Sequence, residues 1–413
     1  MDTASEGRMI GLSDIETARE RLDGHVKRTP TVKSDVLSQV AGSEVFVKLE
    51  NQQHTGSFKE RGALNKLLCL TDEEKRRGVI AASAGNHAQG VAFHASRNGI
   101  RATILMPETT PLIKVQNTHE HGARVVLHGA NFDEAYAEAR RLQEERSLTF
   151  IHPFDDELVI AGQGTIGLEL LEAVPDLDAV IVPVGGGGLI AGIAVAIKAV
   201  RPEVQVFGVQ AARAPSMVRS LEAGEPVTIQ GGRTLADGIQ VKRPGNRTFE
   251  LVQQHVDRVK TVTESELADA IVFLLERQCT LAEGAGAAGV AAILKNHFPE
   301  LRRSKVATII CGGNIDLPLL SLIIERNMVR SGRLMRITVQ VPQRPGGLAE
   351  LLTVVAEQEA SVVQIDHHHT FTSSPFWEAE VALTLETRDA RHAEEVRAGL
   401  KDAGYVLRTR SDF

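Results

Sequence analysis

The chain of 413 residues has few cysteines and no concentration of positive charge. Its three cysteines, Cys69, Cys279 and Cys311, are too scattered for a CxxC pair or a disulfide framework, which indicates a reducing compartment and a cytoplasmic protein. Lys and Arg number 46 against 53 Asp and Glu, a formal net charge of −7, and no Lys/Arg-rich run could neutralise a phosphate backbone or an anionic membrane surface. We therefore expect neither a nucleic acid nor a membrane among the partners.

The N-terminal residues lack the basic and then apolar order of a signal peptide. An uncharged stretch from Ala179 to Ile197 is long enough to be mistaken for a membrane span, but Pro183 and four consecutive glycines interrupt it. It is better interpreted as a buried strand, a glycine turn and a buried helix.

Between about residues 75 and 325, short β-branched runs alternate with helical stretches, which predicts an α/β fold with a parallel sheet. Thr71 and Glu74 form a capping box at the start of a helix, and residues 132–145 carry helix formers with charges on one face. The expected strands are Val79–Ala82, Ala102–Met106, Arg124–Leu127, Val180–Val184, Val204–Val209 and Val306–Ile310.

The pattern changes near Arg330, where MVRSGR forms a short basic joint. Apolar and polar residues then alternate in several runs, which predicts strands with one solvent-exposed face. Helical runs at Leu348–Glu357 and about Ala390–Ala403 separate these strands, so the order is strand, helix, strand, strand, helix, strand. We expect a separate ferredoxin-like βαββαβ domain at residues 331–413.

Three loops share one design, in which an apolar strand ends, a turn rich in Gly and Asn follows, and a helix begins. They are Ser83–His87, Gly185–Leu189 and Cys311–Asn314. Ligands of open α/β sheets bind beyond the carboxyl ends of the strands, and a helix N-terminus favours an anion, so we expect the three loops to form one site. The tetraglycine loop could wrap a phosphate, although taken alone it would be better explained as a tight turn.

Two competing phosphate-binding motifs lack the sequence context that a nucleotide site requires. Gly162–Gly167 fits GxGxxG and Gly186–Ala191 fits GxGxxA, but neither is followed by an acidic residue at the end of the next strand, and no GxxxxGK[ST] occurs. A small phosphorylated cofactor is therefore favoured over a nucleotide. Lys59 lies near the start of a helix, and a lysine, a phosphate cradle and an Asn-containing loop are the parts needed to hold pyridoxal phosphate as a Schiff base.

Six motifs in order carry a resemblance: SFKERGA, SAGNHAQG, GGGGL, TLADGIQVKRPG, AEGAGA and CGGNID. Through these motifs the chain, from about residue 10 to its end, resembles the threonine dehydratase (threonine ammonia-lyase) family of fold-type II pyridoxal phosphate enzymes. The resemblance implies a two-lobed parallel-sheet core like that of the tryptophan synthase β subunit. The catalytic domain would span residues 1–330, with a small lobe inserted at about 52–155.

The resemblance also implies roles for individual residues in cofactor binding. Lys59 would be the catalytic residue that links to the cofactor, Phe58 would flank its ring, and Asn86 would hydrogen-bond its 3-hydroxyl. Cys311 would contact the pyridine nitrogen, where the family more often has serine or threonine, and a thiol is still a neutral group there. The cofactor phosphate would be held by four glycines, Gly185, Gly186, Gly187 and Gly188.

Substrate binding is assigned in the same way. The carboxylate of an amino acid would meet N–H groups of the loop that opens the second helix of the site, again an anion at a helix start. The residues so implied are Ser83, Ala84, Gly85 and His87. No metal is expected: His367, His368 and His369 occupy alternating strand faces and lack ligand spacing, so we interpret them as surface residues.

The C-terminal unit resembles a single ACT domain, with VPQRPGGL at the strand-to-helix turn. ACT domains typically pair and bind amino acids at their interfaces, so a homodimer or homotetramer with an amino-acid effector is implied. An oligomerisation module without a ligand is an equally good interpretation. The identity of any effector, and biosynthetic use for isoleucine as against catabolic use, stay open.

The implied reaction is dehydration and deamination of L-threonine to 2-oxobutanoate and ammonia, with L-serine giving pyruvate as a secondary activity. A serine racemase or a serine-specific dehydratase on the same scaffold is an alternative, although racemases of this type carry serine where this chain has Ala84. A cysteine synthase is a further alternative, but the chain resembles that family less well at the lysine and asparagine loops. A non-catalytic amino-acid sensor is the hypothesis from another class, and the presence of Lys59 argues against it.

Overall fold

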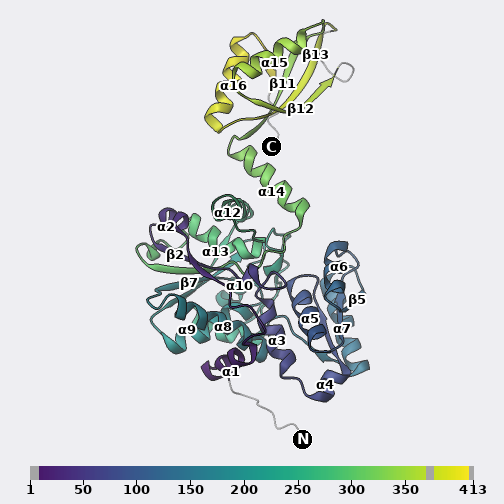
Figure 1. Ribbon diagram of the computed structural model, residues 1–413, viewed down its shortest axis with the longest axis vertical. Helices are drawn as coiled ribbons and strands as arrows, with labels where there is room; N and C mark the ends of the chain where they lie inside the picture. The colour runs from purple at the N-terminus through teal and green to yellow at the C-terminus, as the bar shows by residue number, and fades with distance from the viewer. Residues whose placement is uncertain (1–8, 369–375, 409–413) are drawn as a thin grey trace. The chain divides into compact units, whose positions relative to one another are not determined.

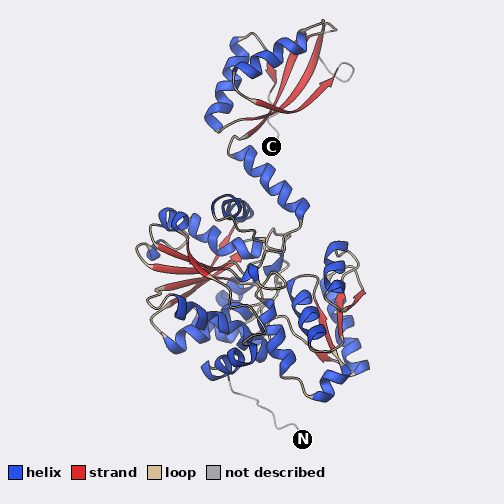
Figure 2. Cartoon of the chain, in the orientation of Figure 1, coloured by secondary structure: helices blue, strands red, loops and turns tan. Residues whose placement is uncertain are grey.

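A computed structural model describes residues 9–368 and 376–408, and His369 of the expected surface histidines lies outside these ranges. The chain divides into two compact units, Met1–Ile315 and Asp316–Phe413. Each unit is described by itself below. Figure 1 labels the elements, and Figure 2 shows that each unit combines helices with sheet.

The smaller sheet of the first unit is entirely parallel, with the spatial order β5-β4-β3-β6. The three strands expected in this region are confirmed residue for residue. A fourth, very short strand completes the sheet at one edge. The strands are β3 (Val79–Ala82), β4 (Ala102–Met106), β5 (Arg124–Leu127) and β6 (Thr149–Phe150).

Helices cover both faces of this sheet because alternate strand residues point to opposite sides. Val79 and Ala81 pack with one apolar cluster that includes residues of α5, while Ile80 and Ala82 pack with another that includes residues of α7. The expected capping box of Thr71 and Glu74 is confirmed. The helices of this lobe are α4 (Asp72–Arg77), α5 (Asn86–Arg97), α6 (Leu112–Glu120) and α7 (Phe132–Arg146), and Figure 1 shows α5, α6 and α7 around the sheet.

The larger sheet has the order β1-β2-β10-β7-β8-β9 and is parallel except for its first strand. Its expected strands are confirmed to within two residues at each end. The strands are β1 (Thr31–Lys33), β2 (Glu44–Lys48), β7 (Ala179–Pro183), β8 (Gln205–Ala211), β9 (Arg258–Val262) and β10 (Lys305–Ile309).

The uncharged stretch at 179–197 forms a buried strand, a glycine turn and most of a buried helix, as expected. None of the helices in the described residues is long and apolar enough to cross a membrane. The helices of this lobe are α1 (Leu12–Leu22), α2 (Asp35–Ala41), α3 (Lys59–Leu68), α8 (Glu157–Ala173), α9 (Gly188–Val200), α10 (Ser216–Ala223), α11 (Asn246–His255), α12 (Glu264–Arg277) and α13 (Gly284–Leu294), with short 3-10 turns at Glu50–Gln52, Asp237–Ile239 and Pro299–Leu301.

The second unit contains the expected βαββαβ order, in an antiparallel sheet of spatial order β12-β13-β11-β14. Its own apolar core includes Ile337, Val339, Leu383 and Val396. A preceding helix includes Met328–Arg330, so the first half of the MVRSGR joint is helical. The elements are α14 (Leu317–Arg330), β11 (Leu334–Pro342), α15 (Gly347–Glu357), β12 (Ser361–His368), β13 (Glu378–Glu386), α16 (Ala390–Asp402) and β14 (Leu407–Arg408).

Candidate active site

Lys59 is the first residue of α3, and backbone bonds tie the residues before it to the end of β10. Ser57 pairs with Gly312 in an isolated antiparallel bridge, and the Phe58 N–H donates to the Cys311 carbonyl at 3.0 Å. These contacts bring together two segments that are about 250 residues apart in the sequence. The Lys59 and Cys311 loops therefore belong to one site.

The residues directly after Lys59 anchor the first turn of α3 in buried ion pairs. The Arg61 guanidinium lies 2.8 Å from Glu50 and 2.6 Å from Glu169, and it is almost fully buried. Its charge partners hold the pKa of Arg61 above its usual value, against the effect of burial. Such a pair is costly to break from one side, so it fixes the helix start and with it the position of Lys59.

The Lys59 amine is enclosed and electrostatically unusual. Its Nζ donates to the Pro153 carbonyl at 2.7 Å and lies 5.2 Å from the centre of the Phe58 ring. Burial lowers the pKa of Lys59 from 10.5 to about 8, although nearby Cys311 and Glu283 partly oppose the shift. A lysine of this kind has a sizeable neutral fraction near pH 8 and can act as a nucleophile and a base.

Asn86 begins α5 and has both ends of its amide group engaged. Its Nδ2 donates to Glu283 Oε1 at 2.7 Å, and its Oδ1 accepts from Asn314 Nδ2 at 2.8 Å. The two partners come from the start of α13 and from the loop after β10. This network joins the Ser83–His87 and Cys311–Asn314 loops, as the sequence predicted, and fixes which way the amide points.

Glu283 and Cys311 are both buried and both shifted toward their neutral forms. Burial, with Asp237 as a second cause, raises the pKa of Glu283 to about 7. Burial, together with the Glu283 charge, raises the pKa of the Cys311 thiol well above 9. The floor of the site beside Lys59 is therefore a set of uncharged or half-charged groups near pH 7.

The tetraglycine loop lies between β7 and α9, and its backbone has free donors. Among the described residues, nothing accepts from the N–H groups of Gly185, Gly186 or Gly187, and α9 begins directly after them. The loop is held by the Thr248 hydroxyl, which donates to the Gly186 carbonyl at 2.6 Å. Free N–H groups at a helix start form a favourable site for an anion.

The glycines of this loop are required for a second reason, which the sequence did not reveal. A Cβ on Gly186 would lie 2.4 Å from the Phe154 ring, and Gly188 approaches the backbone of the same residue. Gly187 has a φ of +100°, a conformation that side chains rarely adopt. Phe154 therefore packs against the loop, and a residue larger than glycine at position 186 would displace its ring.

The Ser83–His87 loop follows β3, and its last residue is turned inward. His87 Nε2 lies 2.9 Å from the Ile151 carbonyl, and burial, with Lys59 as a second cause, lowers the pKa of His87 to about 3. The ring is thus neutral and donates to this carbonyl. Ala84 packs against the small-lobe core, and the space around Gly85 is open, with nothing within 4 Å of the position of a Cβ.

Comparison with known proteins shows to which family this chain belongs. The sequence profile of the family described as pyridoxal-phosphate dependent enzyme matches residues 22–312. The chain belongs to this family. As a member of the pyridoxal-phosphate dependent enzymes, it uses pyridoxal phosphate as its cofactor, as its sequence predicted.

Relatives within the family match either almost the whole chain or about three quarters of it. The L-threonine ammonia-lyase of Thermotoga maritima is 52% identical over 400 residues, 97% of this chain and 99% of that protein. The catabolic L-threonine dehydratase of Escherichia coli K12 is 47% identical over 315 residues, 76% of this chain and 96% of that protein.

Solved structures give the same fold for most of the chain. The processed threonine deaminase isoform 2 of Solanum lycopersicum superposes with a TM-score of 0.72 at 36% identity, over 79% of this chain and 93% of that one. Maize serine racemase superposes with a TM-score of 0.74 at 35% identity, over 78% and 99%.

The donors and acceptors of the site fit this cofactor. The free N–H groups of the tetraglycine loop match a phosphate, and the neutral fraction of Lys59 matches an aldehyde. The buried polar atoms that lack a partner among the described residues include Ser57 Oγ, next to Phe58, and His87 Nδ1. Unpaired buried atoms of this kind are rare unless a ligand or water meets them.

Several residues of this pyridoxal phosphate site escaped the sequence reasoning. Glu283 and Asn314 lie in motifs that were recognised, but nothing in the sequence shows that both bind Asn86. Phe154 and Arg61 act through packing and buried pairing. The position of Arg61 two residues after Lys59, on the same helix, could have indicated its role from the sequence.

Proposed function

We propose that this protein is an L-threonine ammonia-lyase that converts L-threonine to 2-oxobutanoate and ammonia, with L-serine to pyruvate as a secondary activity. The observation that carries the proposal is the 52% identity with an L-threonine ammonia-lyase over 97% of the chain. The partly buried lysine at the start of α3 and the Asn86 network support such an activity.

We assign the cofactor contacts residue by residue. Lys59 would hold the cofactor covalently, Phe58 would flank its ring, and Asn86 would hydrogen-bond its 3-hydroxyl. The phosphate would be held by Gly185, Gly186, Gly187 and Gly188, and Cys311 would face the ring nitrogen. When bound, pyridoxal phosphate withdraws electrons from the substrate Cα and so acidifies its proton.

The chain's own residues would then move protons and orient the substrate. The loop that leads into α5, with Ser83, Ala84, Gly85 and His87, would bind the substrate carboxylate. The Ser83 N–H already donates to the Leu105 carbonyl and the Gly85 N–H to the Ser83 hydroxyl, so the N–H groups of Ala84 and His87 and the Ser83 hydroxyl would make the contacts. The Lys59 amine, once free, would accept the Cα proton, and its lowered pKa suits that role near neutral pH. The β-hydroxyl leaves as water, and a later hydrolysis returns one water and releases ammonia.

The test is a product assay on the purified, cofactor-loaded enzyme. We expect 2-oxobutanoate from L-threonine and pyruvate from L-serine, each with one equivalent of ammonia. Lys59→Ala should abolish both, because the variant lacks the amine that would hold the cofactor covalently and accept the Cα proton. Turnover retained by this variant, or no oxo acid from either amino acid, would overturn the proposal.

Serine racemisation is the second candidate, because maize serine racemase superposes over 78% of the chain. A racemase needs a proton donor on the cofactor face opposite the lysine, and the methyl group of Ala84 cannot donate. We expect pyruvate to form from L-serine much faster than D-serine. Chiral analysis of the products decides between the two, and a faster accumulation of D-serine would establish the racemase.

For the C-terminal unit we propose an ACT regulatory domain within a homodimer or homotetramer. Its βαββαβ order and separate apolar core support this assignment. The sequence-based boundary of the two domains, at residues 330 and 331, belongs to the same proposal. We also propose a cytoplasmic location, which the three free cysteines support.

A further inference from the structure

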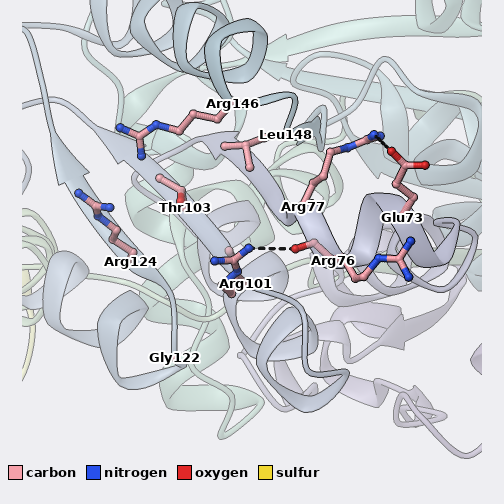
Figure 3. A pocket seen from close by; sticks show the side chains of 10 residues that line it. Glu73, Arg76, Arg77, Arg101, Thr103, Gly122, Arg124, Arg146 and Leu148 are labelled. Atoms are coloured by element: carbon pink, nitrogen blue, oxygen red, sulfur yellow. Dashed lines mark hydrogen bonds and ion pairs between the residues drawn. The ribbon is translucent and has the colours of Figure 1, made fainter.

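A second concave region lies in the small lobe, away from Lys59. It has a volume of about 620 Å³ and is lined by five arginines, Arg76, Arg77, Arg101, Arg124 and Arg146. Figure 3 shows the side chains of these arginines, which line the pocket together with Thr103 and Leu148. We call these five residues the arginine pocket.

The arginine pocket occupies the amino end of the smaller sheet. Arg77 precedes β3, Arg101 precedes β4, Arg124 begins β5, and Arg146 ends α7 just before β6. In a parallel sheet all of these points meet at one edge. The loop at Ser83 follows the other end of β3, so the pocket and the proposed substrate loop lie at opposite edges of the same sheet.

Positive charge in the pocket is poorly compensated. Glu73, which bonds Arg77 at 2.7 Å, is the one acidic residue in the lining. Arg146 approaches Glu145 only to 3.8 Å, and that carboxylate already bonds Arg141 at 2.5 Å. In the described part of the chain the guanidinium groups of Arg76 and Arg124 have no hydrogen-bond or ion-pair partner, in a protein with a net charge of −7.

Helix dipoles account for only part of this arrangement. Arg76, Arg77 and Arg146 lie in the last turns of α4 and α7, where a cation is favourable in any protein. Arg101 and Arg124 are not in helices, and Arg101 donates only to a neutral acceptor, the Arg76 carbonyl, at 2.9 Å. Their convergence on the same hollow calls for a negative ligand.

We propose that the arginine pocket binds a small organic phosphate that carries at least two phosphate groups. Guanidinium groups pair with phosphate oxygens in a bidentate way, so several arginines around one hollow suit several phosphate oxygens. The pocket volume lies in the range of about 300–1,000 Å³ that is usual for small-molecule sites and leaves room beyond one phosphate. Thr103 and Leu148 offer a hydroxyl and an apolar surface to the rest of the ligand.

This site is separate from the proposed threonine ammonia-lyase activity and does not depend on it. A ligand here would bridge the ends of α4 and α7 and the starts of two strands. It would therefore stabilise the small lobe against unfolding by mass action, whatever reaction occurs at Lys59.

The experiment uses pyrophosphate as the probe and the full-length, cofactor-loaded enzyme, so that the tetraglycine loop is already occupied. Binding is measured by calorimetry and by thermal unfolding in a buffer with constant EDTA, with sodium chloride at equal ionic strength as the reference. The test variant is Arg76→Gln with Arg124→Gln, because these two side chains lose no contact that the structure records. The control is Arg219→Gln with Arg258→Gln, which removes the same charge from exposed positions elsewhere.

We expect pyrophosphate to bind with a submillimolar dissociation constant, to raise the unfolding temperature beyond the effect of salt, and to bind the control equally well. The test variant should bind about tenfold or more weakly, because two charge-assisted contacts are lost. Equal affinity in the test variant, or an effect no larger than that of salt, would overturn the proposal.

Discussion

The state of single side chains decides what the site around Lys59 can do. Burial lowers the pKa of its amine to about 8, although the neighbouring Cys311 and Glu283 partly oppose the shift. An exposed lysine would be protonated almost entirely at that pH. The catalytic role that we propose for Lys59 thus depends on its burial, and the Pro153 carbonyl accepts a hydrogen bond from its amine.

The lowered pKa predicts how capture of the cofactor depends on pH. Only the neutral amine attacks an aldehyde, so the rate should rise with pH up to about 8 and level above it, whereas an ordinary lysine would continue to about 10.5. The measurement is the rate of covalent labelling of Lys59 when cofactor-free enzyme meets pyridoxal phosphate, trapped with borohydride and followed by mass spectrometry. A rate that kept increasing tenfold per pH unit from 8.5 to 10 would contradict the assignment.

Cys311 offers a second test at this scale. Cys311→Asp places a carboxylate in a buried position next to Glu283, which should raise the pKa of both carboxyl groups and attract a proton toward the ring nitrogen. We expect a loss of threonine deamination of about tenfold or more, or diversion to side products. Cys311→Ser, which is neutral and of similar size, is the control and should stay close to the unchanged enzyme. If both variants kept the same rate and products, position 311 would not face the cofactor.

At the scale of elements, the site depends on how three turns are held at the ends of strands. The turn between β7 and α9 is enclosed by Phe154 on one side and by Thr248 on the other. The start of α3 is held by the buried pairs of Arg61. The backbone donors of the tetraglycine loop are thus oriented before any ligand arrives, which lowers the entropic cost of binding.

The conformation of Gly187 gives the prediction at this scale. Gly187→Ala introduces a Cβ 2.8 Å from Thr248 at a φ of +100°. Strain of this kind costs about 1–3 kcal/mol, so the unfolding free energy should fall by that amount and pyridoxal phosphate should bind more weakly. Chemical denaturation and cofactor titration measure the two effects. The control is Gly11→Ala, whose Cβ would meet only Asp14, at 4.0 Å.

If Gly187→Ala matched the Gly11→Ala control in both stability and cofactor affinity, the turn would be free to rearrange. The glycine would then be replaceable, and the phosphate assignment would lose its structural support.

For the whole molecule, the question is what the C-terminal unit adds. All proposed catalytic residues precede Ile315, and the second unit has its own apolar core. The relative from Escherichia coli is shorter than this chain, because its match covers 76% of this chain and 96% of its own length.

Truncation after Ser331 tests the proposed division of labour. The shortened chain should keep threonine deamination within about twofold, since its core is intact, but lose any response to isoleucine or valine and associate less strongly. Activity with and without each amino acid, together with sedimentation of both forms, measures these effects. An isoleucine response that survived truncation would place the effector site in the first unit.

The sequence alone determined six strands of the first unit and the βαββαβ order of the second, but it did not predict β1, β2, β6 or β9. Val79–Ala82 and Ala102–Met106 were predictable because strand runs and helix caps are local patterns. The loop motifs were predictable because parallel strands end at one edge. Only the tertiary structure decided what surrounds each group, since burial and pairing depend on residues far apart in the chain. The binding of Asn86 by Glu283 and Asn314, the approach of Phe154 to the glycines and the lowered pKa of Lys59 all arise in this way.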